Sequence, residues 1–396
     1  MIRTPIRTLT ALAALAMSSF FTPAAFAQGE VLKIGLVSPQ SGANARYGAF
    51  ANKGANLAAK EINAAGGVLG KKIELVPGDS QCVPAEGVAA TQRLITFDKA
   101  PIIIGDVCSS VTLAMQPLAE EAKVLLVNAA SSNPDITYKS GVGGYKWTFR
   151  NYPTDEVRAA VVLDHSVKNR GFKKFAVLSV DSDYGRGAIK FTKKYLPKYP
   201  DAQILSEDYY KEAETDFRPV LSKIRLSGAQ AIIMYGQADT TPIVARQMLE
   251  MGLAGKVALV GNGEFNAKST IAAAPKVMNG AVEAAAWLPE WQGPKSLKFV
   301  EDYKSAYGGE MPNNHAYVHW ETLHLVAAAI KAANSLKNED VRNALSKIKY
   351  ESAMGTVTFD DHNQAVLPMV LLEVADGKPV IKGAITTKVE YPAAAK

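Results

Sequence analysis

The sequence predicts an α/β protein of two lobes, each a doubly wound parallel sheet with helices on both faces. Short apolar runs alternate with amphipathic segments along most of the chain, which is typical of βαβ units. This alternation starts twice, first at Val31 and again at Lys146. The chain has 396 residues, enough for two to three domains, and no long polar linker separates the two series. We therefore expect two lobes joined by three crossings of the chain.

The first series predicts four strands and three helices in alternation. Apolar runs that end at Gly, Pro or Ser indicate buried strands, and apolar residues at helical spacing indicate the helices. The expected strands are 31–37, 72–76, 101–105 and 124–127, and the expected helices are 50–64, 86–97 and 110–122. Ser109 or Ser110 is expected to cap the third helix, because serine is a preferred N-cap residue.

The second series predicts a second parallel sheet of similar size. Its expected strand–helix pairs are 146–149 with 154–169, 175–180 with 186–195, 203–207 with 217–226, 231–235 with 241–251, and 257–260 with 267–273. A strand at 280–286 then leads to helices at 295–307, 315–334 and 339–347, before strands at 356–360, 366–374 and 380–385. We assign 28–150 and 285–353 to the N-terminal lobe, and 151–284 and 354–396 to the C-terminal lobe.

Residues 1–27 have the pattern of a secretory signal peptide. Arg3 and Arg7 precede an uncharged apolar run, and Ala25-Phe26-Ala27 provides a small-residue cleavage site. A membrane anchor is the alternative, but the apolar run is shorter than the roughly 20 residues that cross a bilayer. We expect cleavage after Ala27 and export of the mature chain.

Charge and cysteine content limit the functions open to the exported chain. Its formal net charge is +6, or +4 without the two leader arginines (42 basic minus 38 acidic residues). The basic residues are scattered, so we expect no nucleic-acid partner. An oxidising compartment allows Cys82 and Cys108 to form a disulfide, which we favour over a catalytic thiol with a histidine base.

Sequence motifs of common enzymes are absent, and we expect neither catalysis nor a cofactor. The chain lacks G-x-S-x-G, H-E-x-x-H and the Walker P-loop. Asp181 and Asp183 form a carboxylate pair for a secreted hydrolase, but a turn is the preferred interpretation. His315 and His319 lie one helical turn apart and would suit a metal, yet no other His/Cys cluster accompanies them. We interpret them as a packed helix face.

Polar loops after the predicted strands indicate a ligand site. Ligands of doubly wound folds bind outside the carboxyl ends of the strands, so two facing lobes would share one cleft. Ser109 and Ser110 follow a strand at a helix start, where free N–H groups and the dipole favour a carboxylate. The loop 128–134 adds further hydroxyl groups. In the second lobe, Asp239 and Glu264 follow strands and suit a ligand ammonium.

Several motifs resemble the type I periplasmic binding proteins, the Leu/Ile/Val-binding receptor group of ABC importers. The resemblance covers essentially the whole mature chain. Its most specific signs are Ile34-Gly-Leu-Val-Ser-Pro-Gln-Ser-Gly42 with Tyr47, Glu61-Ile-Asn-Ala-Ala-Gly-Gly-Val-Leu-Gly-Lys71, Cys82 with Cys108-Ser109-Ser110, Ser131-Ser132-Asn-Pro134, and Asp183-Tyr184-Gly185.

The resemblance implies a ligand carboxylate held by the Ser109 hydroxyl, the Ala130 backbone and the Ser132 hydroxyl. It also implies Tyr47 and Tyr184 against the ligand side chain and Glu264 near the ammonium. Gln237-Ala-Asp239 stands where branched-chain receptors often have a tyrosine, so Asp239 is a second candidate for the ammonium contact. The full candidate set is Tyr47, Ser109, Ser110, Ala130, Ser131, Ser132, Tyr184, Asp239 and Glu264.

The function that the resemblance implies is solute capture in the periplasm by closure of the two lobes. A monomer would bind an aliphatic or branched-chain amino acid and deliver it to a membrane permease, with no metal and no covalent chemistry. An aromatic carboxylate, a short amide or urea is the alternative ligand, and presentation to a membrane sensor is the alternative role. The lobes are expected to hinge near 149–153, 283–287 and 351–356.

Overall fold

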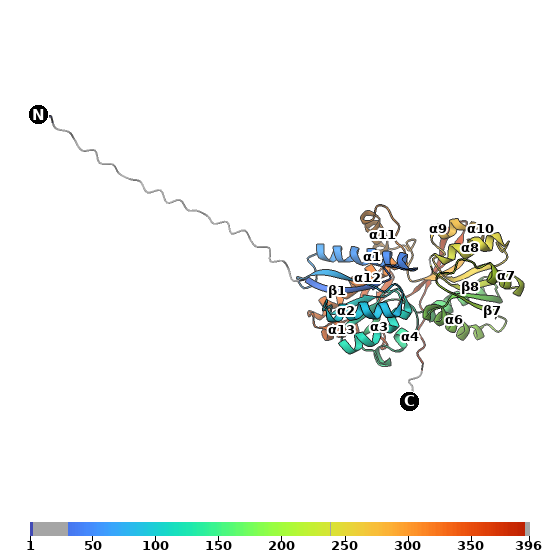
Figure 1. Cartoon of the computed structure of the whole chain (residues 1–396), viewed down its shortest axis with the longest axis horizontal. Coiled ribbons are helices and arrows are strands. Elements are labelled where there is room, and N and C mark those ends of the chain that lie inside the picture. The colour runs from blue at the N-terminus through green and yellow to red at the C-terminus, as the bar shows by residue number, and fades with distance from the viewer. Residues whose placement is uncertain (3–30, 238, 393–396) are drawn as a thin grey trace.

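The computed structural model describes residues 1–2, 31–237 and 239–392, and the last two ranges form two α/β lobes (Figure 1). The two-lobed fold class is therefore confirmed. Almost all of the expected signal peptide lies outside the described residues. Within them, no helix is both long and apolar enough to cross a membrane.

The first lobe is built on a five-stranded parallel sheet in the order β2-β1-β3-β4-β5. Its strands are β1 Val31–Ser38, β2 Lys72–Asp79, β3 Ile102–Gly105, β4 Leu125–Asn128 and β5 Thr148–Arg150. Its connecting helices are α1 Ala45–Ala64, α2 Pro84–Thr96, α3 Ser109–Ala122 and the short α4 Asp135–Tyr138. Strands β3 and β4 are buried on both faces, as expected for a sheet covered by helices on both sides.

The second lobe is built on a seven-stranded sheet in the order β14-β13-β10-β9-β8-β6-β7. The parallel strands are β6 Lys174–Val180, β7 Gln203–Tyr210, β8 Ala231–Tyr235, β9 Ala258–Asn262 and β10 Val282–Ala285. The antiparallel edge consists of β13 Met369–Ala375 and β14 Lys378–Ile385. The helices are α5 Asp155–Asp164, α6 Asp183–Tyr195, α7 Arg218–Ser227, α8 Thr240–Glu250, α9 Lys268–Ala273 and α10 Pro275–Met278.

Both sheets repeat one strand order, since β2-β1-β3-β4-β5 matches β7-β6-β8-β9-β10. After β10 the chain returns to the first lobe through α11 Pro294–Ala306, α12 Asn314–Ala333 and α13 Asn338–Leu345. Helix α12 packs along α1. A hairpin of β11 Tyr350–Ser352 and β12 Gly355–Val357 precedes the passage to β13.

Two local expectations were wrong. The strand expected at 146–149 as the start of the second sheet is β5, which pairs with β4 at the edge of the first sheet. Helix α3 begins after Cys108, and no side chain caps it, so neither Ser109 nor Ser110 is the N-cap. The exact lobe boundaries stay a prediction, and the one expected at 353/354 falls inside the β11–β12 hairpin.

Candidate ligand-binding site

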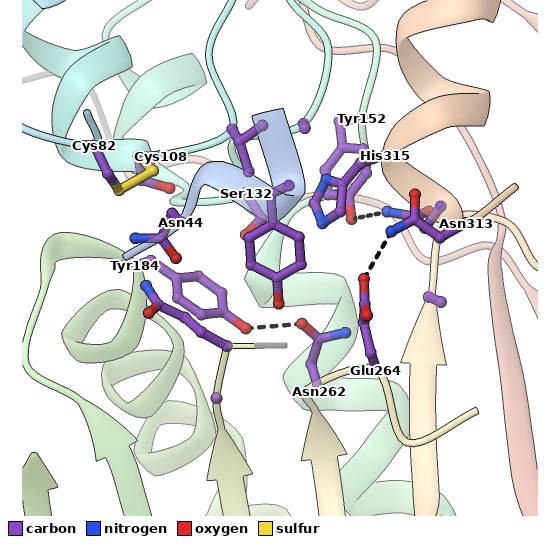
Figure 2. A pocket seen from close by; sticks show the side chains of 18 of the residues that line it. Asn44, Cys82, Cys108, Ser132, Tyr152, Tyr184, Asn262, Glu264, Asn313 and His315 are labelled. Carbon is purple, nitrogen blue, oxygen red and sulfur yellow. Dashed lines mark hydrogen bonds between the residues drawn. A yellow bond between two sulfur atoms is a disulfide. The ribbon is translucent and has the colours of Figure 1, made fainter. Parts of the chain in front are cut away.

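A cavity of about 830 Å³, including its open mouth, lies between the two lobes (Figure 2). Its walls come from loops that follow strands of both sheets and from the start of α12. The lining residues are Asn44, Tyr47, Cys82, Val107, Cys108, Ser109, Ser110, Ala130, Ser132, Tyr152, Arg158, Ser182, Tyr184, Glu212, Gly236, Gln237, Asn262, Glu264, Asn266, Glu283, Ala285, Leu288, Asn313, Asn314 and His315. Seven of the nine candidate residues are among them.

The start of α3 forms the donor-rich wall of the cavity. Asp106 Oδ1 accepts a hydrogen bond from the Cys108 amide at 2.6 Å, which shapes the turn after β3. A disulfide joins Cys108 to Cys82 and fixes the helix start to the loop after β2. The Ser109 hydroxyl accepts a hydrogen bond from the backbone N–H of Asn133 at 3.2 Å, so the hydroxyl proton of Ser109 is available to a ligand. Uncapped first-turn N–H groups and this hydroxyl suit an anion.

The loop after β4 differs from what the resemblance implied. Asn128 Oδ1 accepts hydrogen bonds from the amides of Ala130 and Ser131, both at 2.8 Å. The Ala130 N–H is thereby occupied, although Ala130 lines the cavity. The Ser131 hydroxyl donates to the Asp106 carbonyl at 2.6 Å and does not line the cavity. An asparagine side chain often bonds to backbone amides just after it in an Asx turn, so Asn128 in the sequence was a local signal for these bonds.

Ser132 reaches the cavity but is held by a buried ion pair. Its hydroxyl donates to Asp155 Oδ2 at 2.9 Å and lies 3.4 Å from Arg158 Nη1. Arg158 pairs with Asp155, and both side chains are fully buried. Burial alone lowers the pKa of Arg158, but the Asp155 carboxylate outweighs it and raises that pKa, so the guanidinium stays charged. Ser132 therefore orients this wall, and its proton is not directed at a ligand.

The opposite wall is the loop after β9, which Glu283 holds in place. The Glu283 carboxylate accepts hydrogen bonds from the amides of Gly263 at 3.1 Å, Glu264 at 2.9 Å and Asn266 at 3.3 Å. Glu264 has a φ of 54°, a left-handed conformation that is uncommon for glutamate. Such strained residues cluster at ligand sites. Three backbone bonds to one buried carboxylate thus aim the Glu264 side chain into the cavity (Figure 2).

The Glu264 carboxylate is largely buried and contacts the first lobe. Its side chain is 12% exposed, accepts a hydrogen bond from Asn313 Nδ2 at 2.8 Å and lies 3.3 Å from Arg46 Nη2. Burial raises the pKa of Glu264 to about 7, an effect that Arg46 opposes. Loss of solvent favours the protonated form unless a cation approaches the carboxylate. A ligand ammonium would supply such a cation.

Aromatic rings form the apolar parts of the walls. The Tyr184 hydroxyl donates to Asn262 Oδ1 at 2.8 Å (Figure 2). The Tyr47 ring contacts His315, with 4.4 Å between centroids. Burial lowers the pKa of His315 to about 3, so this imidazole is neutral at the cavity wall.

Asp239 lies outside the cavity, in contrast to the role suggested for it. Its side chain is 68% exposed, with Oδ1 3.5 Å from Arg46 Nη1 at the rim. Trp147 is buried in the first lobe, with its ring 4.7 Å from the Arg342 guanidinium, and does not line the cavity.

The residues considered for other chemistries do not gather into a site. Asp181 pairs with Arg186 at 2.6 Å, and neither Asp181 nor Asp183 lines the cavity. His319 Nδ1 contacts the His315 carbonyl at 2.8 Å inside α12. In the part of the chain that the structure describes, no group of three or more potential metal ligands occurs.

Several cavity residues were not singled out from the sequence. Asn313 directly precedes α12, and Asn314 is its first residue. Asn314 bonds to the Tyr152 hydroxyl, more than 160 residues away in the sequence. Arg158 lies inside helix α5. Only the Asn-Asn pair before an apolar helix is a recognisable N-cap signal, and Asn313 is indeed the cap, accepting a bond from the Ala316 amide at 3.1 Å. The others are brought together by tertiary structure alone.

The lobes contact each other on either side of the cavity. Asn44 Nδ2 donates to Glu212 Oε2 at 3.2 Å, and Asn133 Nδ2 donates to the Asp183 carbonyl at 2.6 Å. With the Arg46–Glu264 pair, these bonds hold the two lobes together over the site. One cavity enclosed by strand-end loops of two doubly wound lobes defines a two-lobed binding protein.

Comparison with known proteins gives the family. The periplasmic binding protein family model matches residues 31–379, and the chain belongs to that family. An amino acid binding protein of Pseudomonas aeruginosa is 31% identical over 85% of this chain and 90% of its own length.

Solved structures agree with this assignment. A leucine-binding protein of Thermotoga maritima superposes with a TM-score of 0.79 at 26% identity, over 90% of this chain and 99% of that one. A branched-chain amino acid transporter substrate-binding protein of Streptococcus pneumoniae, in complex with isoleucine, gives 0.80 at 25% identity, over 91% and 100%.

Proposed function

We propose that this protein is the periplasmic solute-binding component of an ABC importer and that its ligand is an amino acid. The observation that carries the proposal is the polarity of the cavity. The uncapped start of α3 with Ser109 offers hydrogen-bond donors from one lobe, and Glu264 offers a buried carboxylate from the other. An α-carboxylate and an α-ammonium are complementary to these two walls. The amino acid binding relative and the isoleucine complex support the same class of ligand.

Binding would work by closure of the lobes. A ligand that touches both walls favours the closed state over the open one by its differential affinity, and the closed form is the one a permease would dock. Micromolar to sub-micromolar capture corresponds to about −8 to −10 kcal/mol, which is reasonable for one small molecule with two charged contacts. The export and the cleavage after Ala27 belong to this proposal.

The first test is a thermal-shift screen of the mature protein with the common amino acids, aromatic acids, dicarboxylates, short amides and urea. Stabilisation by amino acids supports the proposal, because a ligand that binds only the folded state raises the melting temperature. Stabilisation only by compounds without an amine would contradict the role given to Glu264 while keeping the two-lobed capture mechanism.

Ser109→Ala is expected to weaken amino acid binding about tenfold or more, since it removes a hydrogen bond to a charged group. The dissociation constant from isothermal titration calorimetry is the measurement. Ser305→Ala, on the exposed face of α11, is the matched control and should leave the affinity unchanged. Equal affinity of the Ser109 variant and the wild type would remove Ser109 from the carboxylate site.

Amino acid affinity is expected to fall as the pH is lowered from 8 to 5. A pKa raised to about 7 means that Glu264 gains its proton as pH falls through 7, and the protonated carboxyl no longer attracts an ammonium. Proton linkage then increases the dissociation constant by about 100-fold over this range. Glu264→Gln should bind weakly at both pH values and lose most of the pH dependence, with any remainder assigned to Asp106, whose burial also raises its pKa to about 7. A wild-type affinity that is constant from pH 8 to pH 5 would show that Glu264 does not meet the ammonium.

A further inference from the structure

Three polar side chains gather at the end of the cavity beside the disulfide. Asn44 comes from the first lobe, while Glu212 follows β7 and Gln237 follows β8 in the second lobe; all three line the cavity. Figure 2 shows Asn44 next to the disulfide, across the cavity from Glu264 and Asn313. The cavity therefore has a carboxylate at each end.

The hydrogen bonds of this cluster leave acceptors in excess. Asn44 Nδ2 donates to Glu212 Oε2 at 3.2 Å, and Gln237 Nε2 donates to Glu212 Oε1 at 3.1 Å. Each carboxylate oxygen can accept a further bond, and the carbonyl oxygens of the two amides add more acceptors. A ligand group placed here is best matched if it brings several N–H donors.

The charges at the two ends also differ. Glu264 pairs with Arg46 at 3.3 Å. Glu212 is half-buried, and among the residues that the structure describes it makes no ion pair with a lysine, arginine or histidine. Arg46 lines a small pocket together with Glu212, but its guanidinium pairs with Asp239 and Glu264. A carboxylate partly removed from water is stabilised when an opposite charge approaches it. A second cation of the ligand, in addition to the α-ammonium assigned to Glu264, would consequently be favoured at the Glu212 end.

We propose that the ligand is an amino acid whose side chain ends in a cationic amine or guanidine, and that Glu212 accepts its N–H groups. This inference rests on the proposed function, because the α-carboxylate and α-ammonium are assigned to Ser109 and Glu264. The Tyr184 ring lies between Asn44 and Asn262 in Figure 2 and offers an apolar surface to the methylene groups of such a side chain. Glu212 is then the residue that determines side-chain specificity.

Matched pairs of amino acids test the proposal. Lysine and norleucine have the same carbon chain and differ in the terminal amine, as do ornithine and norvaline. Isothermal titration calorimetry of the wild type should show that the cationic member of at least one pair binds about tenfold more tightly, as a charged hydrogen bond would give. In Glu212→Gln, this ratio should fall toward one.

The ratio of dissociation constants separates specificity from a structural role. If Glu212 only joined the lobes through Asn44, Glu212→Gln would weaken both members of a pair equally, and the proposal would be wrong. Glu214→Gln is the control in the same loop, because Glu214 accepts from the Thr215 amide and does not line the cavity. It should keep the wild-type ratio.

The two proposals fail in different ways. Tighter binding of norleucine, norvaline or leucine than of lysine, ornithine and arginine would overturn the specificity and leave the amino acid function intact. Binding of no amino acid at all would overturn the function itself.

Discussion

Arg158→Met is expected to destabilise the protein by about 3–5 kcal/mol, because it leaves the Asp155 carboxylate buried without a partner. Both side chains are fully buried. Arg158 also donates to the Ala284 carbonyl at 3.1 Å and lies 3.5 Å from the Tyr152 hydroxyl. The guanidinium thus connects α5 to β10, two segments next to crossings between the lobes. The free energy of unfolding from chemical denaturation measures the effect.

Two comparisons make this prediction specific. Arg225→Met changes an exposed arginine of α7 and should shift the stability by no more than about 0.5 kcal/mol. Adding Asp155→Asn to Arg158→Met should recover part of the lost stability, because the unpaired charge is then removed. A single Arg158 variant as stable as the Arg225 variant would show that the buried pair is not ionised.

Replacement of both cysteines by serine is expected to cost about 3.5 kcal/mol, the chain-entropy value for the loop between them. Cys82 and Cys108 are 26 residues apart in sequence. The bond also fixes the start of α3, since Cys108 is its N-cap residue. Ligand affinity should therefore fall together with stability. Unfolding curves and calorimetry of the double variant, beside the wild type, measure both effects.

The reduced wild-type protein provides the control for the disulfide. Treatment with a thiol reductant should lower the midpoint of unfolding of the wild type and leave that of the double serine variant unchanged. An equal response of the two proteins, or a double variant as stable as the wild type, would contradict a stabilising role for this bond.

Periodic patterns predicted most of the elements, and the misses have physical causes. The strand at 231–235 is found with the same bounds, because its five apolar residues are buried on both faces. Helix α1 begins at Ala45, five residues before the expected start. Its first turns lack an apolar pattern, and Gly48 is needed there because a Cβ would lie 1.9 Å from the Pro39 carbonyl. Such a close approach of two backbone segments produces no periodic pattern of apolar residues, so the sequence did not predict this part of the helix.

The sequence predicted which loops line the cavity, but it did not predict which hydrogen bonds their residues make. Strand-end position places Ser109, Tyr184 and Glu264 on one cavity, since the carboxyl ends of parallel strands share one edge of each sheet. Which N–H or hydroxyl remains available depends on neighbours, as Asn128 shows for Ala130. Residues such as Glu212 depend on how the lobes face each other, which no motif in the chain encodes.

The hydrogen bonds between the lobes bear on how long a captured molecule stays. Asn133 donates to the Asp183 carbonyl and Asn44 donates to Glu212, and both bonds join the lobes directly, with no ligand between them. If these bonds keep a fraction of the free protein closed, a ligand has less free energy to spend on closing the lobes, and its apparent affinity is higher. In the proposed capture mechanism the same bonds would have to break before escape, so the dwell time of the cargo would be governed by the opening of the lobes as well as by its own contacts. Weakening the Asn133 bond would thus shorten retention without altering a single group that lines the cavity.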